Sequence, residues 1–315
     1  MSQTKLTEKQ KQQLAILEPM LKVAADSRDY EKAKDITVQI QNVLRPTGHE
    51  TRLMQSKNRL FEVAMESGHI RTAIPGFIGV RNKVSKRTRL YLEATTLLAI
   101  CFLRKKDLNS ARPYMVESLN SENNIKSIQK RTQYRVALAE RFDQEALLAG
   151  LSSPDQEQLN PDKIQDEAGK LIYEKHEDEI LELLGGTVPK GAESFINDVH
   201  KESQGLLTYE EKKKLPSPVA FKERKKLGKN VLSAFQSVLW HSLCDKDSEV
   251  YKMWFTNGMQ ALLDRKYLAA AIGAALYGLG IGVKAIAVYV LALIIKMGIE
   301  TFCSLYRPSN IMGLR

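Results

Sequence analysis

Cysteine is scarce in this sequence of 315 residues, which contains only Cys101, Cys244 and Cys303. Because the three are widely spaced and odd in number, they predict neither a disulfide framework nor a zinc ribbon. We therefore expect a reducing, cytoplasmic site of action. The first residues, MSQTKLTEKQKQQ, lack the apolar stretch of a secretory signal peptide, which agrees with that expectation.

Motifs of catalysis and metal binding are also missing. No GxxxxGK(S/T) phosphate-binding loop occurs, and the acidic string at residues 174–179 lacks the HExxH order of a zinc protease. His241 and Cys244 would share one helix face, but two ligands do not make a zinc site. We therefore expect a protein that is not an enzyme and has no cofactor and no metal.

Alternating strand patterns are absent as well. Apolar residues recur at intervals of three and four positions, which predicts an all-α protein. Charged residues make up 27% of the chain, and this share argues against a multi-span transporter.

The formal net charge of +10 is spread unevenly along the chain. It is +10 over residues 1–150, −7 over residues 151–215 and +7 over residues 216–315. Because complementary fields favour association, we expect the acidic middle to pack against one of the basic parts. Solvated helix faces of differing sign are the alternative.

The N-terminal half carries a weak internal repeat. Three short segments each combine a turn, an aromatic or apolar residue and an alanine three positions later, at spacings of 40 and 38 residues. Each follows an apolar stretch of helical period. The segments are 28–33, 68–73 and 106–111.

These segments resemble tetratricopeptide-like helical repeats. The third unit carries Leu98, Ala99, Phe102, Leu108 and Ala111 in the order that this family shows. The resemblance covers roughly residues 14–120. It implies a solenoid of helical hairpins with a curved surface that binds a peptide or protein partner. An irregular helical bundle, in which the three repeated alanines serve only packing, is the alternative.

A linker rich in Ser, Asp, Gln and Pro at residues 152–161 indicates a domain boundary. We predict a basic repeat domain over 1–150, an acidic-to-basic helical domain over 151–263 and an apolar helical hairpin over 264–315. Within the second domain, the pattern predicts one long acidic helix over residues 161–184, which Gly185 and Gly186 end.

Two basic clusters are candidate binding sites for an anionic partner. Either cluster could bind the phosphates of a nucleic acid without sequence specificity. Either could equally attract anionic lipid headgroups or an acidic protein. Solvated, solubilising faces are the alternative for both clusters. The first cluster comprises Arg71, Arg81, Lys83, Lys86, Arg87 and Arg89, and the second comprises Lys212, Lys213, Lys214, Lys222, Arg224, Lys225, Lys226 and Lys229.

The most apolar stretch, residues 267–295, has Lys284 as its only charge. Gly278, Gly280 and Gly282 interrupt it, which predicts a hairpin with arms at about 267–277 and 285–305. Small residues four positions apart favour close helix contact, so we expect a membrane-associating or homo-oligomerising hairpin. Burial in the core of a helical bundle is the alternative. The candidate contact residues are Leu268, Ile272, Gly273, Gly278, Gly282, Ile286, Tyr289 and Leu293.

These features favour a non-enzymatic interaction protein that binds a partner through its repeats and acts through its C-terminal hairpin at the inner membrane. The layout is similar to that of bacterial toxin and phage-defence effectors, in which a partner restrains a hydrophobic element. The alternative is a soluble nucleic-acid-binding or scaffold protein whose C-terminal hairpin is buried core.

Overall fold

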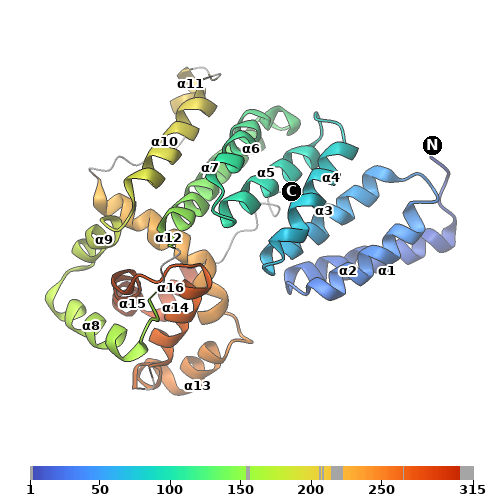
Figure 1. The fold of residues 1–315 in the computed structure, drawn as a ribbon. Helices are drawn as coiled ribbons and strands as arrows, with labels where there is room; N and C mark the ends of the chain where they lie inside the picture. The colour runs from blue at the N-terminus through green and yellow to red at the C-terminus, as the bar shows by residue number, and fades with distance from the viewer. Residues whose placement is uncertain are drawn as a thin grey trace. The chain divides into compact units, whose positions relative to one another are not determined.

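The structure is a computed structural model that describes residues 3–153, 157–205, 207, 209–213, 223–264 and 266–305. This part of the chain forms helices and no strand, so the prediction of an all-α protein is confirmed (Figure 1). The helices are α1 (Glu8–Asp26), α2 (Tyr30–Leu44), α3 (Glu50–Glu66), α4 (Ile70–Lys83), α5 (Arg89–Arg104), α6 (Leu108–Asn120), the 3-10 helix η1 (Glu122–Asn124), α7 (Ile128–Leu151), α8 (Pro161–Glu174), α9 (Glu177–Gly185), α10 (Lys190–Gln204), α11 (Tyr209–Lys213), α12 (Arg224–Leu243), α13 (Glu249–Asp264), α14 (Tyr267–Gly278), α15 (Lys284–Met297) and α16 (Ile299–Leu305).

The chain divides into two compact units. Unit 1 comprises residues 1–136 and 202–209, and unit 2 comprises residues 137–201 and 210–315. The predicted boundaries after residues 150 and 263 both fall inside unit 2.

Unit 1 is a succession of antiparallel helical hairpins. Each of the helices α1 to α5 packs against the next one in the chain, and α3 also contacts α1 and α5. The three hairpins that begin with α1, α3 and α5 turn in the same way, because each turn contains one residue with positive φ. These residues are Arg28 (φ 55°), Gly68 (φ 82°) and Lys106 (φ 64°).

The backbone hydrogen bonds of the three turns are also equivalent. The residue after each positive-φ position donates its N–H to a carbonyl five residues earlier, which satisfies a helix-end acceptor. The alanine four residues further on is fully buried in every hairpin, at 0% exposure. The donor–acceptor pairs are Asp29 to Ala24 (2.9 Å), His69 to Ala64 (2.7 Å) and Asp107 to Phe102 (2.9 Å). The repeat seen in the sequence therefore corresponds to a repeated local geometry.

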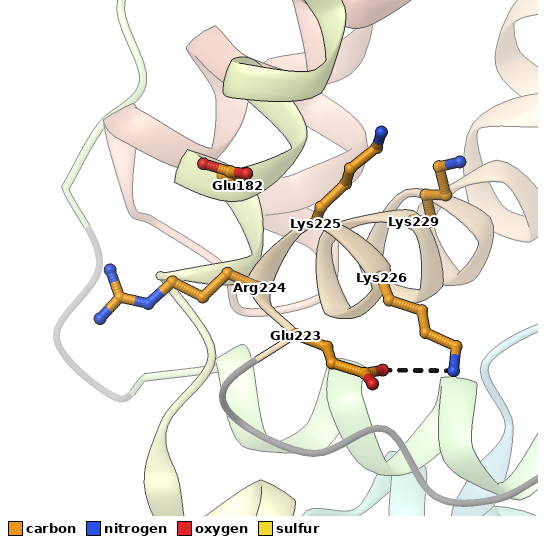
Figure 2. A pocket seen from close by; sticks show the side chains of 6 residues that line it. All are labelled: Glu182, Glu223, Arg224, Lys225, Lys226 and Lys229. Carbon is orange, nitrogen blue, oxygen red and sulfur yellow. Dashed lines mark ion pairs between the residues drawn. The ribbon is translucent and has the colours of Figure 1, made fainter.

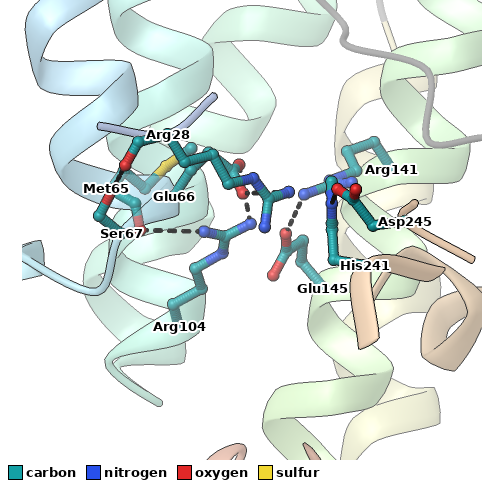
Figure 3. A network of polar contacts seen from close by, with 9 residues as sticks. All are labelled: Arg28, Met65, Glu66, Ser67, Arg104, Arg141, Glu145, His241 and Asp245. Carbon is teal, nitrogen blue, oxygen red and sulfur yellow. Dashed lines mark hydrogen bonds and ion pairs between the residues drawn. The ribbon is translucent and has the colours of Figure 1, made fainter. Parts of the chain in front are cut away.

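Polar side chains join one turn to the next (Figure 3). The Glu66 carboxylate accepts a hydrogen bond from Arg104 Nη2 at 3.0 Å and lies 3.4 Å from Arg28 Nη2. The Ser67 hydroxyl donates to the Arg28 carbonyl at 2.8 Å, and Arg104 Nη1 donates to the Met65 carbonyl at 3.2 Å. One carboxylate thus links all three hairpins at their turn ends.

Unit 2 is built around the apolar helix α15. This helix packs against α8, α9, α14 and α16. Every residue from Ile286 to Ile294 is buried except Tyr289, which is half-buried. Burial of apolar surface is the main favourable term in folding, at about 25 cal/mol per Å². The most apolar segment of the sequence therefore contributes the core of this unit.

The acidic segment of the chain lies against the basic C-terminal segment within unit 2. The Glu167 carboxylate accepts a hydrogen bond from Lys284 Nζ at 2.7 Å, and Asp162 pairs with Lys266. In α8, Gln165 Nε2 also donates to the Leu263 carbonyl at 2.6 Å. The hydrogen bond that Lys284 donates to the Glu167 carboxylate raises the pKa of Lys284. The expected packing of acidic on basic parts is confirmed here.

The predicted helix over 161–184, however, is broken into α8 and α9 at Lys175 and His176.

A disulfide joins Cys244, which caps the end of α12, to Cys303 in α16, 59 residues further on. The spacing of the cysteines did not indicate this disulfide. Because disulfides persist mainly in oxidising surroundings, the cysteines no longer support the expected reducing site of action. The third cysteine, Cys101, is buried and keeps its thiol.

Within the described residues, none of the helices combines the length and the hydropathy that crossing a membrane requires.

Helices α9 and α12 cross at two glycines. A Cβ atom added to Gly228 would lie 1.9 Å from the Leu181 carbonyl oxygen, and one added to Gly185 would lie 2.0 Å from the Arg224 carbonyl oxygen. Real Cβ atoms do not approach backbone oxygens so closely. Both positions therefore require glycine, although glycine lowers helix propensity by about 1 kcal/mol relative to alanine.

We predict that Gly228→Ala lowers the free energy of unfolding by about 1–3 kcal/mol, because the added methyl forces α9 and α12 apart. Denaturant unfolding followed by circular dichroism measures the change. Gly169→Ala is the matched control, since Gly169 lies on the exposed face of α8 with nothing within 4 Å of an added Cβ. This control should stabilise the protein slightly, and equal shifts for both variants would contradict the tight crossing.

Candidate anion-binding site

A basic pocket lies where the first turns of α12 meet α9. It has a volume of about 410 Å³. Four basic and two acidic side chains line it (Figure 2). They are Glu182, Glu223, Arg224, Lys225, Lys226 and Lys229.

The glycine crossing positions this pocket. Because Gly185 and Gly228 bring the two backbones into contact, the first turn of α12 lies directly against the end of α9. Arg224, Lys225 and Lys226 are the first three residues of α12, and Lys229 follows one turn later. The unpaired N–H groups at a helix N-terminus carry a partial positive charge that adds to these cations.

Two of the four cations are already paired. Lys225 Nζ donates to Asp178 in α9 at 2.5 Å, and Lys226 Nζ lies 3.2 Å from the Glu223 carboxylate. Arg224 and Lys229 are exposed, and neither makes an ion pair with any residue that the structure describes. The pocket therefore offers a surplus of positive charge to an incoming anion.

The cationic side chains of this pocket are chemically able to contact an anion without forming a covalent bond. An arginine guanidinium can donate two parallel hydrogen bonds to a phosphate or carboxylate, and lysine adds a point charge. In Figure 2, the cationic side chains fan out from α12 in different directions. This spread suits an extended partner with several anionic groups. Lys214 and Lys222, which we also predicted here, lie outside the described residues.

The first predicted cluster is only partly a free surface, because Arg81 is used inside unit 1. Its guanidinium lies 4.9 and 4.8 Å from the ring centroids of Tyr91 and Tyr114. Arg81 Nη2 donates to Tyr91 Oη and to Glu117, both at 2.7 Å. Burial and the hydrogen bond to Glu117 raise the pKa of Tyr91. Arg89 similarly pairs with Glu93 at 3.1 Å.

The other four residues of that cluster, Arg71, Lys83, Lys86 and Arg87, are exposed and make no ion pair with a described residue. Sequence reasoning missed a neighbour of this group, Lys57 in α3. Burial lowers the pKa of Lys57, and the nearby charges of Arg45 and Lys83 lower it further. Only the packing of α2, α3 and α4 brings these charges together, so no linear pattern could have identified them.

The predicted contact residues of the hairpin lie mostly inside unit 2. The side chains of Leu268, Ile272 and Leu293 are 0% exposed, and Ile286 is 1% exposed. A Cβ atom on the buried Gly273 would touch Leu159 and Ile164 at 3.6 and 3.8 Å. Gly282 is buried and Tyr289 is half-buried, whereas Gly278 is exposed. This burial is what the alternative interpretation, a hairpin in the core, requires.

A polar pair in unit 2, between the buried His200 and the partly buried Asp143, was not recognised from the sequence. His200 Nε2, in α10, lies 2.8 Å from Asp143 Oδ1, in α7. Burial raises the pKa of Asp143, and the hydrogen bond and charge of His200 lower it in part. Burial and the charge of Asp143 raise the pKa of neighbouring Glu140.

Among the described residues, no three His, Cys, Asp or Glu side chains come close enough together to hold a metal ion.

Comparison of this chain with protein families, with curated proteins and with solved structures finds no match.

The partly buried Asp143 predicts a pH dependence of stability. Because its folded pKa is raised above the ordinary value of 3.8, its favourable contribution is complete below that pH and is lost as the pH rises through the folded pKa. Asp143→Asn abolishes this loss. The unfolding free energy of the variant relative to the natural protein should therefore increase from about pH 4 towards neutrality.

Denaturant unfolding across this pH range measures the difference. The same substitution at exposed Asp166 is the control and should leave the shape of the profile unchanged. A profile for Asp143→Asn that runs parallel to that of the natural protein would contradict the effect of burial.

Proposed function

We propose that this protein is a non-enzymatic interaction protein. Unit 1 forms a tetratricopeptide-like solenoid that binds a protein partner, and the pocket at the start of α12 binds anionic groups of that partner. The single observation that carries the proposal is the pair of exposed cations, Arg224 and Lys229, which line one pocket and have no ion-pair partner among the described residues.

The repeated turns of unit 1 support the solenoid. Three hairpins share a positive-φ residue, an equivalent backbone hydrogen bond and a buried alanine. Stacked hairpins of this kind present an extended surface, and each one contacts only its neighbours. Such a surface binds chains or helices of other proteins.

The burial of α14 and α15 favours the interpretation of the C-terminal hairpin as core. A membrane-associating or oligomerising hairpin would have to expose Leu268, Ile272 and Leu293, each of which is 0% exposed here. We therefore propose a scaffold that acts through its anionic partner. Nucleic acid bound without sequence specificity is the second candidate partner, because phosphates fit the same cations.

We predict that Arg224→Ala and Lys229→Ala each weaken binding of an acidic peptide by about tenfold at low salt, since each removes a charge-assisted contact. Fluorescence anisotropy with a labelled poly-glutamate peptide measures the affinity. Lys170→Ala, which removes an exposed charge from α8 outside the pocket, is the matched control and should bind normally.

The same titration with a short single-stranded oligonucleotide and with anionic vesicles tests the other partners. A preference for the oligonucleotide, with a salt dependence that each variant reduces by about one unit of slope, would replace the protein partner by nucleic acid. Equal binding by the pocket variants and the control would contradict the site.

Truncation after Asp264 tests the role of the hairpin. Because α15 contributes the buried residues from Ile286 to Ile294, we predict that the truncated chain loses the helical structure of unit 2 and associates non-specifically. Circular dichroism and size-exclusion chromatography measure this. A folded, monomeric truncated protein with full helix content up to α12 would show that the hairpin is a separable element.

A further inference from the structure

Among the described residues, the short helix α16 packs against α12 and α15. It contains only seven residues, fewer than an isolated helix needs to be stable in water. Ile299 and Phe302, three positions apart, are 3% and 0% exposed where α16 packs against α12 and α15. The Trp240 indole N–H also donates to the Cys303 carbonyl at 3.3 Å.

A hinge and a covalent bond flank these contacts. Gly298, which separates α15 from α16, has φ 84° and ψ 135°, so the chain changes direction there. The bond from Cys303 to Cys244 then ties α16 to the end of α12. A cross-link that closes a loop of this size removes many conformations in which α16 is detached.

The loop closed by the disulfide contains α13, α14 and α15. None of the α13 side chains that the structure describes is buried, and Phe255 is 69% exposed. The aromatic rings of Tyr251, Trp254 and Phe255 pack on one another, and the Trp254 indole N–H donates to the Leu243 carbonyl at 3.1 Å. Helix α13 packs against α12 and α14, so the disulfide and the buried face of α16 are what hold α16 itself in place.

We propose that the Cys244–Cys303 disulfide is a site of reversible reduction, and that a dithiol reductant opens it to release α16 from α12 and α15. Cys244 is 6% exposed, whereas Cys303 is half-buried between the exposed residues Thr301 and Ser304. A thiolate therefore reaches the Cys303 sulfur more easily. This release is independent of anion binding and adds a redox response to the proposed function.

The exchange is balanced in atoms and electrons. One thiolate of the reductant attacks the Cys303 sulfur, the S–S bond breaks, and Cys244 leaves as a thiolate that takes up a proton. The second thiolate of the reductant then attacks the mixed disulfide and releases Cys303, which is protonated in turn. Two electrons pass to the protein, which gains two thiols, and the reductant is oxidised to its own disulfide.

Hydrogen exchange of the full-length protein, with and without dithiothreitol, tests the proposal. We expect amides of α16 to exchange at least about tenfold faster after reduction, because the cross-link no longer opposes local opening. The amides of α5 in unit 1 should be unchanged, and reoxidation should restore the slow exchange. Mass spectrometry after thiol alkylation counts the free cysteines in each state.

Two variants distinguish the release of α16 by reduction from a general loss of stability. Cys303→Ser should show the fast exchange of α16 without reductant, whereas Cys101→Ser, which keeps the disulfide, should behave as the natural protein does. The proposed redox response is overturned if the amides of α16 exchange equally in both redox states, if three free thiols are found before reduction, or if reduction unfolds all of unit 2. None of these outcomes depends on whether the pocket binds anions.

Discussion

The burial of α15 against α8 and α9 is the constraint on which unit 2 depends. Its residues from Ile286 to Ile294 are almost entirely removed from water, and area burial of this kind outweighs what exposed ion pairs contribute. The pairs of Glu167 with Lys284 and of Asp162 with Lys266 join the acidic helix α8 to the two helices of the hairpin. Apolar burial thus supplies the stability, and charge pairing favours this alignment of the helices.

The same packing places the basic pocket. Helix α9 lies on one side against α15 and on the other against α12, where Gly185 and Gly228 allow the backbones to touch. The first turn of α12 is therefore fixed in direction, and Arg224 and Lys229 are held at the surface without partners among the described residues. The packing of the core helix and the contact between the two glycines thus determine where the basic pocket lies.

Local features of this fold could be predicted, whereas features made by distant residues could not. The turn before Ala73 could be recognised because its glycine, apolar residue and alanine lie within six positions. The all-α class and the glycine break between α14 and α15 are local in the same sense. By contrast, the sequence shows Arg81 as one basic residue among several, and only the fold encloses it between two tyrosines. The pairing of Cys244 with Cys303 likewise depends on how α12 and α16 meet.

The buried faces of α14 and α15 form the interior of unit 2. Carbene footprinting of the oxidised, full-length protein in water tests this burial most directly, because the label inserts wherever a side chain is accessible. The account predicts that residues 286–294 of α15 are labelled far less than residues 250–257 of α13, which are partly or largely exposed. Labelling of α15 as strong as that of α13 would contradict the account.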